Sequence, residues 1–553
     1  MALDDDTLES THPLQQADTI SLLDDEQKIG GADAAEVLND LSDPPAVQEE
    51  LSRSALVTVF CSLYVGVFLS ALDGTIVATL LAHIASEFHE FRSVSWIATG
   101  YLIAQAAVQP LYGKVSDVFG RKPVVLFSNV LFGVGSVLCG LSNSIWFLVF
   151  ARVIAGIGGA GLTSMSAITL SDIVPLRQRG LLQGIGNILY GSGAAFGGIV
   201  GGIITDRFGW RWTFLSQGPI ILLSIAAIYF NLNLPKKHVA DSGDKLKRID
   251  FLGSLTMVCG LVLFLFAVSI GGSYQPWLSF SVIAPLVISF FFIGAFVYVE
   301  LYVAAEPVIP LRLLKNRTVA GSSFTSWFLV MVYYAHIFYI AIYSVSVRGV
   351  SPTRSGSSLI PHFVASAAGS LACGAVMRST GRYYRMIILA SCSSTIGAIL
   401  IASVGRETSQ LQVMAYMLFP GFGFGVYLTV TLVGLIAAVP REYQAVTTSI
   451  QYGFRGIGST VGVSVASAVF QNVLAAKLTA RITGENAAEI IRRVSDSVDE
   501  VANLPEDLRD SVIQSYLDSC HAVFYMAVVL IICCAGSSLC MKEYVLHNNV
   551  SRR

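Results

Sequence analysis

Long apolar stretches alternate with short polar segments along nearly all of the chain after residue 54. A helix needs about 20 mostly apolar residues to cross a hydrocarbon core about 30 Å thick. Fourteen stretches are long enough, at residues 55–80, 94–112, 123–141, 145–171, 181–205, 212–232, 250–271, 277–301, 319–346, 356–377, 385–404, 411–438, 444–471 and 520–541. Since lipid offers the backbone no hydrogen bonds, we expect these stretches to be helices and the fold to be an all-α membrane protein.

The composition also indicates an integral membrane protein. Hydrophobic residues make up 54% of the chain and charged residues 13%, about half the charged share of a typical soluble domain. The charges are segregated, since residues 1–53 contain fourteen Asp or Glu residues and only two basic ones, Lys28 and Arg53. We therefore expect residues 1–53 to be a disordered acidic tail without a cleaved signal peptide.

The sequence shows no basis for enzyme chemistry. Its nine cysteines lie almost all in apolar stretches, so neither a disulfide framework nor a metal cluster follows from them. No pair of a nucleophile and a base has a spacing typical of a catalytic set. We expect a protein that is not an enzyme, holds no cofactor or metal, and binds no nucleic acid.

Basic residues predict the orientation of the spans. With Arg385, the first residue of a span, counted among the loops, and with residues 472–519 left out, twenty-two Lys and Arg residues fall on the side of the two tails and six on the opposite side. Because short cytosolic loops carry the excess of Lys and Arg, both termini are expected to be cytosolic. Residues 472–519 are then one large luminal loop, mixed in charge and partly helical, that is either a spacer or a cap.

A charged segment between the second and third spans carries the most specific pattern. Gly113, Asp117 and Gly120 have the spacing G-x-x-x-D-x-x-G and are followed by Arg121 and Lys122. The glycines allow two helix ends to approach closely, and Asp117 can accept hydrogen bonds from a facing helix N-terminus. An ordinary basic loop is the alternative, but the segment resembles the loop motif of the major facilitator superfamily.

A weaker copy of this pattern indicates an internal duplication. Gly374–Arg382, between the tenth and eleventh spans, repeats the spacing with Arg378 in place of the aspartate. A duplicated six-span half predicts two six-helix bundles with a substrate site between them near the midplane, the fold that the superfamily resemblance implies. We therefore expect bundles at residues 54–234 and 318–541, two linker spans within residues 235–317, and a cytosolic tail at residues 542–553.

Two ionisable residues lie within spans of the first half. Asp73, in the sequence L-D-G-T-I-V, is expected either to face a cavity as a proton or cation site or to reach the luminal interface. Arg152 begins the pattern R-x-x-x-G-x-G-x-A and keeps its charge, so it must face protein or water. These patterns resemble the first-span motif of the fourteen-span drug:proton antiporter-2 family and the fourth-span motif of the superfamily. The resemblance implies proton coupling for both, while close helix packing is the alternative for the Arg152 segment.

The fifth span has a glycine-dense face and a polar face. Its glycines resemble the antiporter motif G-x-x-x-G-P-x-x-G-G, but Gly198 stands where the motif has proline, which removes the expected kink and leaves the direction of coupling open. The glycines expected to form a tight sliding contact between the halves are Gly193, Gly197, Gly201 and Gly202. The polar residues at helical spacing, expected either to line a cavity or to hold neighbouring helices together, are Gln183, Asn187 and Tyr190.

The second half adds further candidates. Arg455 places another permanent charge within the thirteenth span, in a pattern that resembles the same span of the drug:proton antiporter-2 family. Asp117 is expected to be an electrostatic partner of this span's cytosolic end. His336 is expected either to titrate near neutral pH or to remain a neutral, hydrogen-bonded imidazole. Besides Arg455, the candidates near the substrate are Tyr333, His336, Gln451 and Tyr452.

As a set, these patterns resemble the drug:proton antiporter-2 family, and within it most closely the fungal vacuolar basic amino acid transporters; S-W-I-A-T-G-Y-L and Q-P-L-Y-G-K-V-S-D add to the likeness. The resemblance implies export of lysine, arginine or histidine from the cytosol into the vacuole in exchange for protons. The alternatives are a plasma-membrane multidrug or toxin exporter and a nutrient sensor that does not transport. Asp18, Leu22 and Leu23 resemble a dileucine signal that an adaptor complex reads on vacuolar cargo.

Overall fold

The computed structural model of the chain describes residues 53–88, 96–174, 176–232, 249–272, 275–350, 352–482, 487–496, 505–544 and 546. Residues 1–54 and 55–553 separate as two units, and the fold reported below is that of the second. The three residues of the expected sorting signal, Asp18, Leu22 and Leu23, lie outside the described residues.

The described residues form helices and no strand, which confirms the all-α fold. The first half contains α3 (Arg53–Phe88), α4 (Trp96–Val108), α5 (Leu111–Phe119), α6 (Arg121–Gly140), α7 (Ile145–Ile173), α8 (Leu176–Phe208), α9 (Trp210–Leu215) and α10 (Gln217–Asn231). The linker contains α11 (Phe251–Ile270), α12 (Phe280–Tyr302) and α13 (Leu311–Leu314). The second half contains α14 (Arg317–Ser346), α15 (Pro352–Ser357), α16 (Ile360–Thr380), α17 (Tyr384–Ala402), α18 (Gln410–Ala437), the short η2 (Arg441–Tyr443), α19 (Gln444–Arg481), α20 (Ala487–Asp496) and α21 (Glu506–Leu539).

Within the described part of the chain, thirteen helical segments are long and apolar enough to cross a membrane. The remaining expected span, residues 94–112, is divided into α4 and α5, which meet at Pro110. Proline lacks the N–H group that would continue the helix, and its ring disfavours a helical conformation for the preceding residue. With α4 and α5 taken as one interrupted span, the structure agrees with the expected fourteen.

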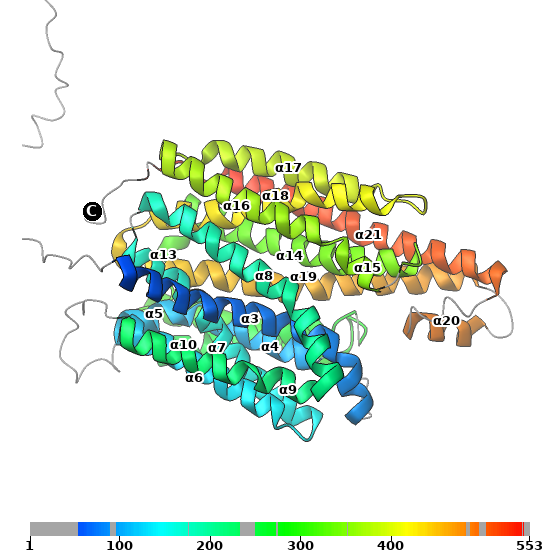
Figure 1. Cartoon of the computed structure of the whole chain (residues 1–553), viewed down its shortest axis with the longest axis horizontal. Helices are drawn as coiled ribbons and strands as arrows, with labels where there is room; N and C mark the ends of the chain where they lie inside the picture. The colour runs from blue at the N-terminus through cyan, green and yellow to red at the C-terminus, as the bar shows by residue number, and fades with distance from the viewer. Residues whose placement is uncertain are drawn as a thin grey trace, which may run out of the picture. The chain divides into compact units, whose positions relative to one another are not determined.

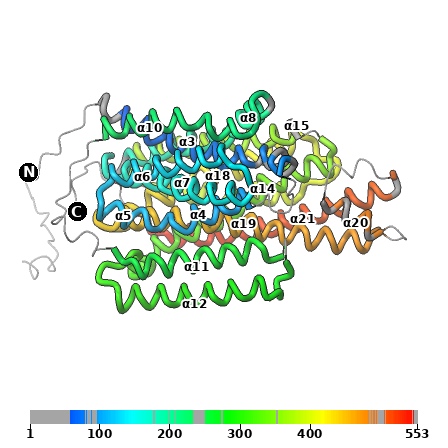
Figure 2. Tube along the Cα trace, turned by 90° about the horizontal axis from the view of Figure 1, so that it is seen from below, coloured from blue at the N-terminus to red at the C-terminus, as the bar shows by residue number. Residues whose placement is uncertain are grey.

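Packing groups the spans into two bundles. In the first, α7 packs against α4 and α6, and in the second, α18 packs against α16 and α17 while α21 packs against α14. Figure 1 shows these helices side by side, with α5 and α13 at one end and α9, α15 and α20 at the other. We call the end that carries residues 113–122 the loop face and the other end the far face. The linker helices α11 and α12 lie as a pair along one side, where α11 packs against α4 and α19 (Figure 2).

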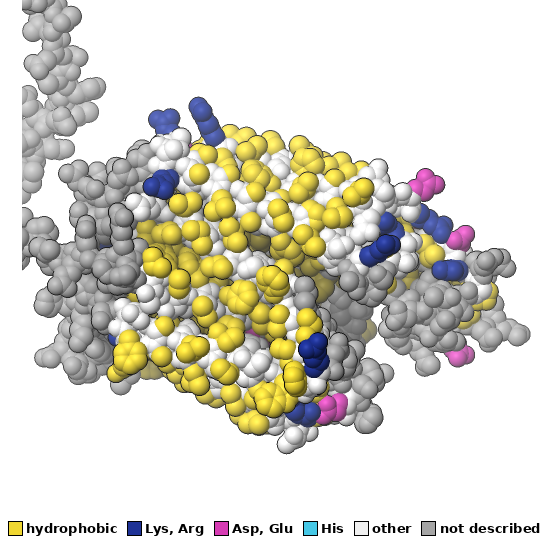
Figure 3. All heavy atoms as spheres, viewed as in Figure 1, with side chains coloured by type: hydrophobic (Ala, Val, Ile, Leu, Met, Phe, Trp, Pro, Cys, Tyr) yellow, Lys and Arg dark blue, Asp and Glu magenta, His cyan; other side chains and the backbone are white. Residues whose placement is uncertain are grey.

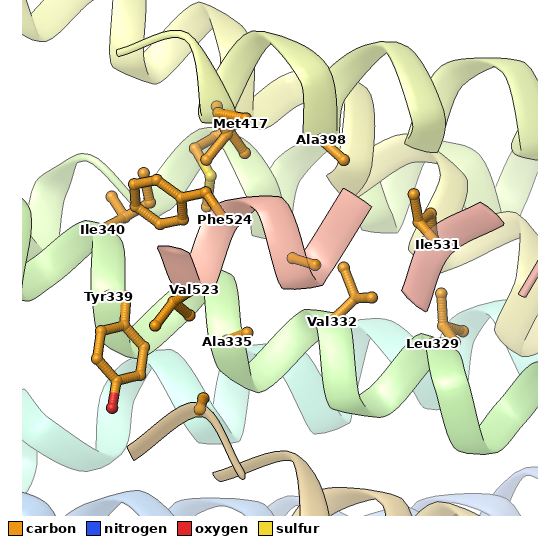
Figure 4. Packing of buried hydrophobic residues seen from close by; sticks show 14 of the residues in the cluster. Leu329, Val332, Ala335, Tyr339, Ile340, Ala398, Met417, Val523, Phe524 and Ile531 are labelled. Carbon is orange, nitrogen blue, oxygen red and sulfur yellow. The ribbon is translucent and has the colours of Figure 1, made fainter. Parts of the chain in front are cut away.

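Apolar side chains both cover and fill the bundles. Figure 3 shows them over the middle of one side, with Lys and Arg toward the two ends, as expected for a surface that a bilayer covers. At the start of α12, Phe280 is 86% exposed, and Leu278 just before the helix is 88% exposed. Inside the second bundle, Ile340, Met417 and Phe524 of three different helices are buried together (Figure 4). This packing supports the helices that line the cavity described next.

Residues 472–519, expected as one large and partly helical loop, are largely helical in the described residues. α19 continues to Arg481 and α21 begins at Glu506, because neither segment contains glycine or proline that would end it at the membrane. The short α20 packs beside them, since the hydroxyl of Tyr516 donates a 2.7 Å hydrogen bond to the carbonyl of Val494. Arg481 and Asp518 join α19 and α21 at 2.7 Å.

Candidate functional site

A cavity of about 400 Å³ lies between the two halves. Helices α3, α4, α7 and α8 form one wall, and α14, α16, α18 and α19 form the other. Of the expected cavity residues, those that line it are Gln183, Asn187, Tyr190, Tyr333, Tyr452 and Arg455. Among the described residues, no Asp or Glu lines the cavity. Its surface is therefore largely apolar and aromatic, with some neutral polar groups and one permanent positive charge.

The polar residues of α8 both line the cavity and join the halves, so the two roles left open by the sequence coexist. Gln183 donates a hydrogen bond to Asn187 at 3.1 Å. The amide of Asn187 in turn donates to the hydroxyls of Ser370 at 3.0 Å and Thr429 at 3.4 Å, on α16 and α18. This network therefore connects the cavity surface on α8 to α16 and α18 of the second half.

Two expected cavity residues lie elsewhere. Gln451 is buried and donates to the hydroxyls of Ser322 and Ser326, at 3.2 and 3.0 Å, so it holds α19 against α14. His336 is 1% exposed, and neither ring nitrogen has a hydrogen-bond partner in the described structure. The expectation that these two line the cavity, and that a neutral His336 is hydrogen-bonded, is wrong, because their helix faces turn into the second bundle.

The sequence reasoning missed several cavity residues. The imidazole of His362 is 1% exposed, lines the cavity and packs against the rings of Tyr333 and Phe424, with centroids 5.5 and 5.7 Å away. Tyr64 on α3 and Tyr334 on α14 add further aromatic surface. A histidine within an apolar span was a usable signal for His362, as it was for His336.

Arg455 is held by neutral groups. Its Nη2 donates to the carbonyl of Leu428 at 3.1 Å, and its guanidinium carbon lies 4.8 Å from the centre of the Tyr452 ring. Its Nε is buried without a hydrogen-bond partner, and no ion pair of Arg455 occurs in the described part of the chain. A neutral carbonyl and a ring face leave the positive charge without a counter-ion at the cavity wall.

Asp73 and Arg152 form an ion pair inside the first bundle. Arg152 Nη1 lies 2.6 Å from Asp73 Oδ2, and both side chains are fully buried. The guanidinium lies 4.2 Å from the centre of the Tyr101 ring, and Gln217 donates to the other carboxylate oxygen at 3.4 Å. Both expected positions for Asp73, in the cavity wall or at the luminal interface, are therefore wrong, because the carboxylate pairs with Arg152 in the core.

The loop motif forms a compact charged cluster. Arg121 lies 2.9 Å from Asp117 and 2.7 Å from Asp172 at the end of α7, so it ties α5 to α7. Gly120 has φ of 90°, a conformation that favours glycine and lets α6 begin directly after α5. Lys122 lies 5.3 Å from the centre of the Tyr229 ring. The expected glycine turn is present, and the charges of the motif hold the first bundle together at the loop face.

The two halves meet closely at the loop face. A side chain at Gly113 would overlap Ser449 of α19, and the Ser449 hydroxyl donates to the carbonyl of Pro110 at 3.0 Å. A Cβ atom on Gly374 of α16 would lie 2.6 Å from the Cα atom of Leu181 of α8. The carbonyl of Pro110, at the break between α4 and α5, thus accepts a hydrogen bond from the opposite half. The close contacts of Gly113 and Gly374 close the cavity at the loop face.

Further from the loop face, α8 and α16 still line the cavity. The cavity-lining side chains Phe196 of α8 and Val364 of α16 are 51% and 60% exposed. On the same two helices, Phe196 and Val364 lie further from the loop face than Leu181 and Gly374 do. The cavity therefore extends from the loop-face contact toward the far face.

The glycines of the fifth span pack within the first half. Side chains at Gly193 and Gly197 would overlap backbone and side-chain atoms of α3, at Phe68 and Thr75. Gly201 is buried, whereas a Cβ atom on Gly202 would meet no atom within 4 Å. The expected sliding contact between the halves at these glycines is wrong; α8 meets the second half at Gly180 and Gly184.

Known proteins resemble this chain along most of its length. Residues 63–463 match the model of the Major Facilitator Superfamily. The vacuolar membrane amino acid uptake transporter fnx2 of Schizosaccharomyces pombe is 35% identical over 508 residues, 91% of this chain and 88% of that protein. The multidrug resistance protein fnx1 of the same yeast is 36% identical over 511 residues, 91% of this chain and 96% of that protein. The human organic anion transporter MFSD10 shares the fold, with a TM-score of 0.55 and 14% identity over 86% of this chain and 99% of that one.

Proposed function

The chain belongs to the Major Facilitator Superfamily, and from this premise we propose that it carries basic amino acids from the cytosol into the vacuole in exchange for protons. The observation that carries the proposal is the cavity between the halves, whose aromatic walls offer ring faces to a cationic side chain. Its volume of about 400 Å³ suits a small solute. The likeness to a vacuolar amino acid uptake transporter supports the same substrate class.

The proposed cycle alternates access between the two faces. Under the proposal both termini and the loop face are cytosolic, and the far face is luminal. The present arrangement, in which the halves meet closely at the loop face and the cavity extends toward the far face, is then the state that faces the vacuole. Loading from the cytosol requires α5 and α8 to separate from α19 and α16 while the far face closes.

Proton coupling is proposed at the Asp73–Arg152 pair. A proton on Asp73 would remove the negative charge that neutralises the buried guanidinium, and so would favour a different arrangement of the helices around Arg152. The same helix that carries Arg152, α7, lines the cavity through Thr163 and Ser166. A proton gradient supplies about 1.4 kcal/mol per pH unit for each proton that crosses.

A multidrug exporter of the plasma membrane is the second candidate. It is favoured by the 36% identity to a multidrug resistance protein and by the largely apolar cavity surface. The two candidates differ in what they carry and where they reside. The vacuolar proposal also requires the signal at Asp18, Leu22 and Leu23 to be read by an adaptor complex.

Uptake by isolated vacuoles tests the proposal. Vacuoles from a yeast strain without its own basic amino acid uptake, with and without this chain, would receive labelled lysine, arginine and histidine. We expect ATP-energised uptake that depends on the chain and is abolished by a proton uncoupler. Normal vacuolar localisation without chain-dependent uptake of any of the three would refute the proposed substrate class.

A further inference from the structure

Two arginines lie within membrane spans, Arg152 and Arg455, and in the described residues only Arg152 has a carboxylate partner. Arg152 is fully buried and has a carboxylate 2.6 Å away. Arg455 lines the cavity, and its contacts in the described part of the chain are neutral: the carbonyl of Leu428, and the ring and hydroxyl of Tyr452. An arginine cannot lose its proton at accessible pH, so the charge of Arg455 must be balanced by something other than deprotonation.

The cavity itself does not supply the balancing charge. No Asp or Glu of the described residues lines it, so Arg455 is its one permanent charge there. While the cavity is open, water can solvate the exposed part of the guanidinium. When the halves close around a substrate, that water is lost, and an uncompensated charge in a low-dielectric site is strongly unfavourable. An anionic group on the substrate would remove this penalty during the closed step.

The surroundings of Arg455 prepare it for such a group. The ring of Tyr452 and the carbonyl of Leu428 fix one edge and one face of the guanidinium, and its Nε retains an unused hydrogen. A planar guanidinium binds a carboxylate through two parallel N–H groups better than any other side chain does. The aromatic side chains on the opposite wall, Tyr64 and Tyr190, leave the remaining space suitable for a cationic or apolar part.

We propose that Arg455 is the anchor for a carboxylate of the transported molecule, and that the carrier therefore selects amino acids over the amines that lack this group. The inference rests on the proposed function and extends it, because it names the part of the substrate that the second half recognises. Lysine and cadaverine, arginine and agmatine, and histidine and histamine differ only by the carboxylate, and so form matched pairs.

Uptake and binding of these pairs test the anchor on the unmodified protein. We expect each amine to inhibit labelled lysine uptake about tenfold to 100-fold more weakly than its amino acid, the range for loss of one charge-assisted contact. Thermal stabilisation of the purified protein by the same six molecules should follow the same order. Equal inhibition by lysine and cadaverine would overturn the anchor while leaving lysine transport intact, whereas absence of lysine uptake would refute the proposed function. Failure of all three amino acids to stabilise the protein would overturn the anchor as well.

Variants add a second, independent measure. Arg455→Gln should abolish the preference for lysine over cadaverine, and Arg455→Lys should restore it only in part, because ammonium lacks the planar pair of donors. Arg382→Gln, the same change on an exposed residue at the loop face, is the matched control and should keep the preference. An unchanged preference in a folded Arg455→Gln protein would overturn the proposal.

Discussion

Replacing Asp73 by Asn should destabilise the protein far more than a single polar change at its surface. The carboxylate lies 2.6 Å from Arg152, and both side chains are fully buried, so the variant leaves a guanidinium in the core beside a neutral amide. Removing one partner of a buried ion pair costs about 3–5 kcal/mol. Because the amide oxygen can still accept one hydrogen bond, we expect the lower end of this range, about 3 kcal/mol.

Unfolding of the purified protein in detergent, followed by tryptophan fluorescence, measures this loss. Asp518→Asn is the matched control, since Asp518 pairs with Arg481 at a partly exposed site where an ion pair contributes about 1 kcal/mol or less. The double variant Asp73→Asn with Arg152→Gln removes both charges and should regain stability relative to Asp73→Asn alone. Equal unfolding midpoints for the two single variants would refute this reasoning. Undiminished proton-coupled uptake by either Asp73 variant would remove the pair from coupling.

Three further changes test other parts of the mechanism. Gly113→Leu should lower the maximal uptake rate about tenfold, because its side chain overlaps α19 when the loop face closes, whereas Gly294→Leu, in open space, should not; vacuolar uptake kinetics compare them. Asp117→Ala should lower the maximal rate without changing KM, since its carboxylate pairs at the loop face; a raised KM with a normal rate would contradict this. Replacing Leu22 and Leu23 by Ala should move a fluorescently tagged protein from the vacuolar rim to the plasma membrane or endosomes; surface location of the unmodified protein would defeat the vacuolar assignment.

The spans could be predicted from the sequence because a bilayer imposes a simple condition. Each crossing segment must satisfy its backbone internally and be apolar over a fixed length, and both requirements are visible as local composition. The interruption at Pro110 has a local cause as well. The helical extent of residues 472–519 was harder to predict, because helices that leave the membrane lose their apolar signature while keeping their helical backbone.

The site could be predicted only as far as single helices determine it. Spacing along α8 placed Gln183, Asn187 and Tyr190 on one face, and that face does line the cavity. Which helix lies opposite a given face depends on packing between segments distant in the chain, which one sequence does not contain. Asp73 and Arg152 were each recognisable as charges that need a partner, yet they are 79 residues apart and their pairing required the structure. Arg455 illustrates the reverse case, because the same sequence signal, an arginine in a span, here marks a charge at the cavity wall without a carboxylate partner in the described residues. The physical distinction between the two arginines is the presence of a carboxylate on the facing helix, and only the fold reveals it.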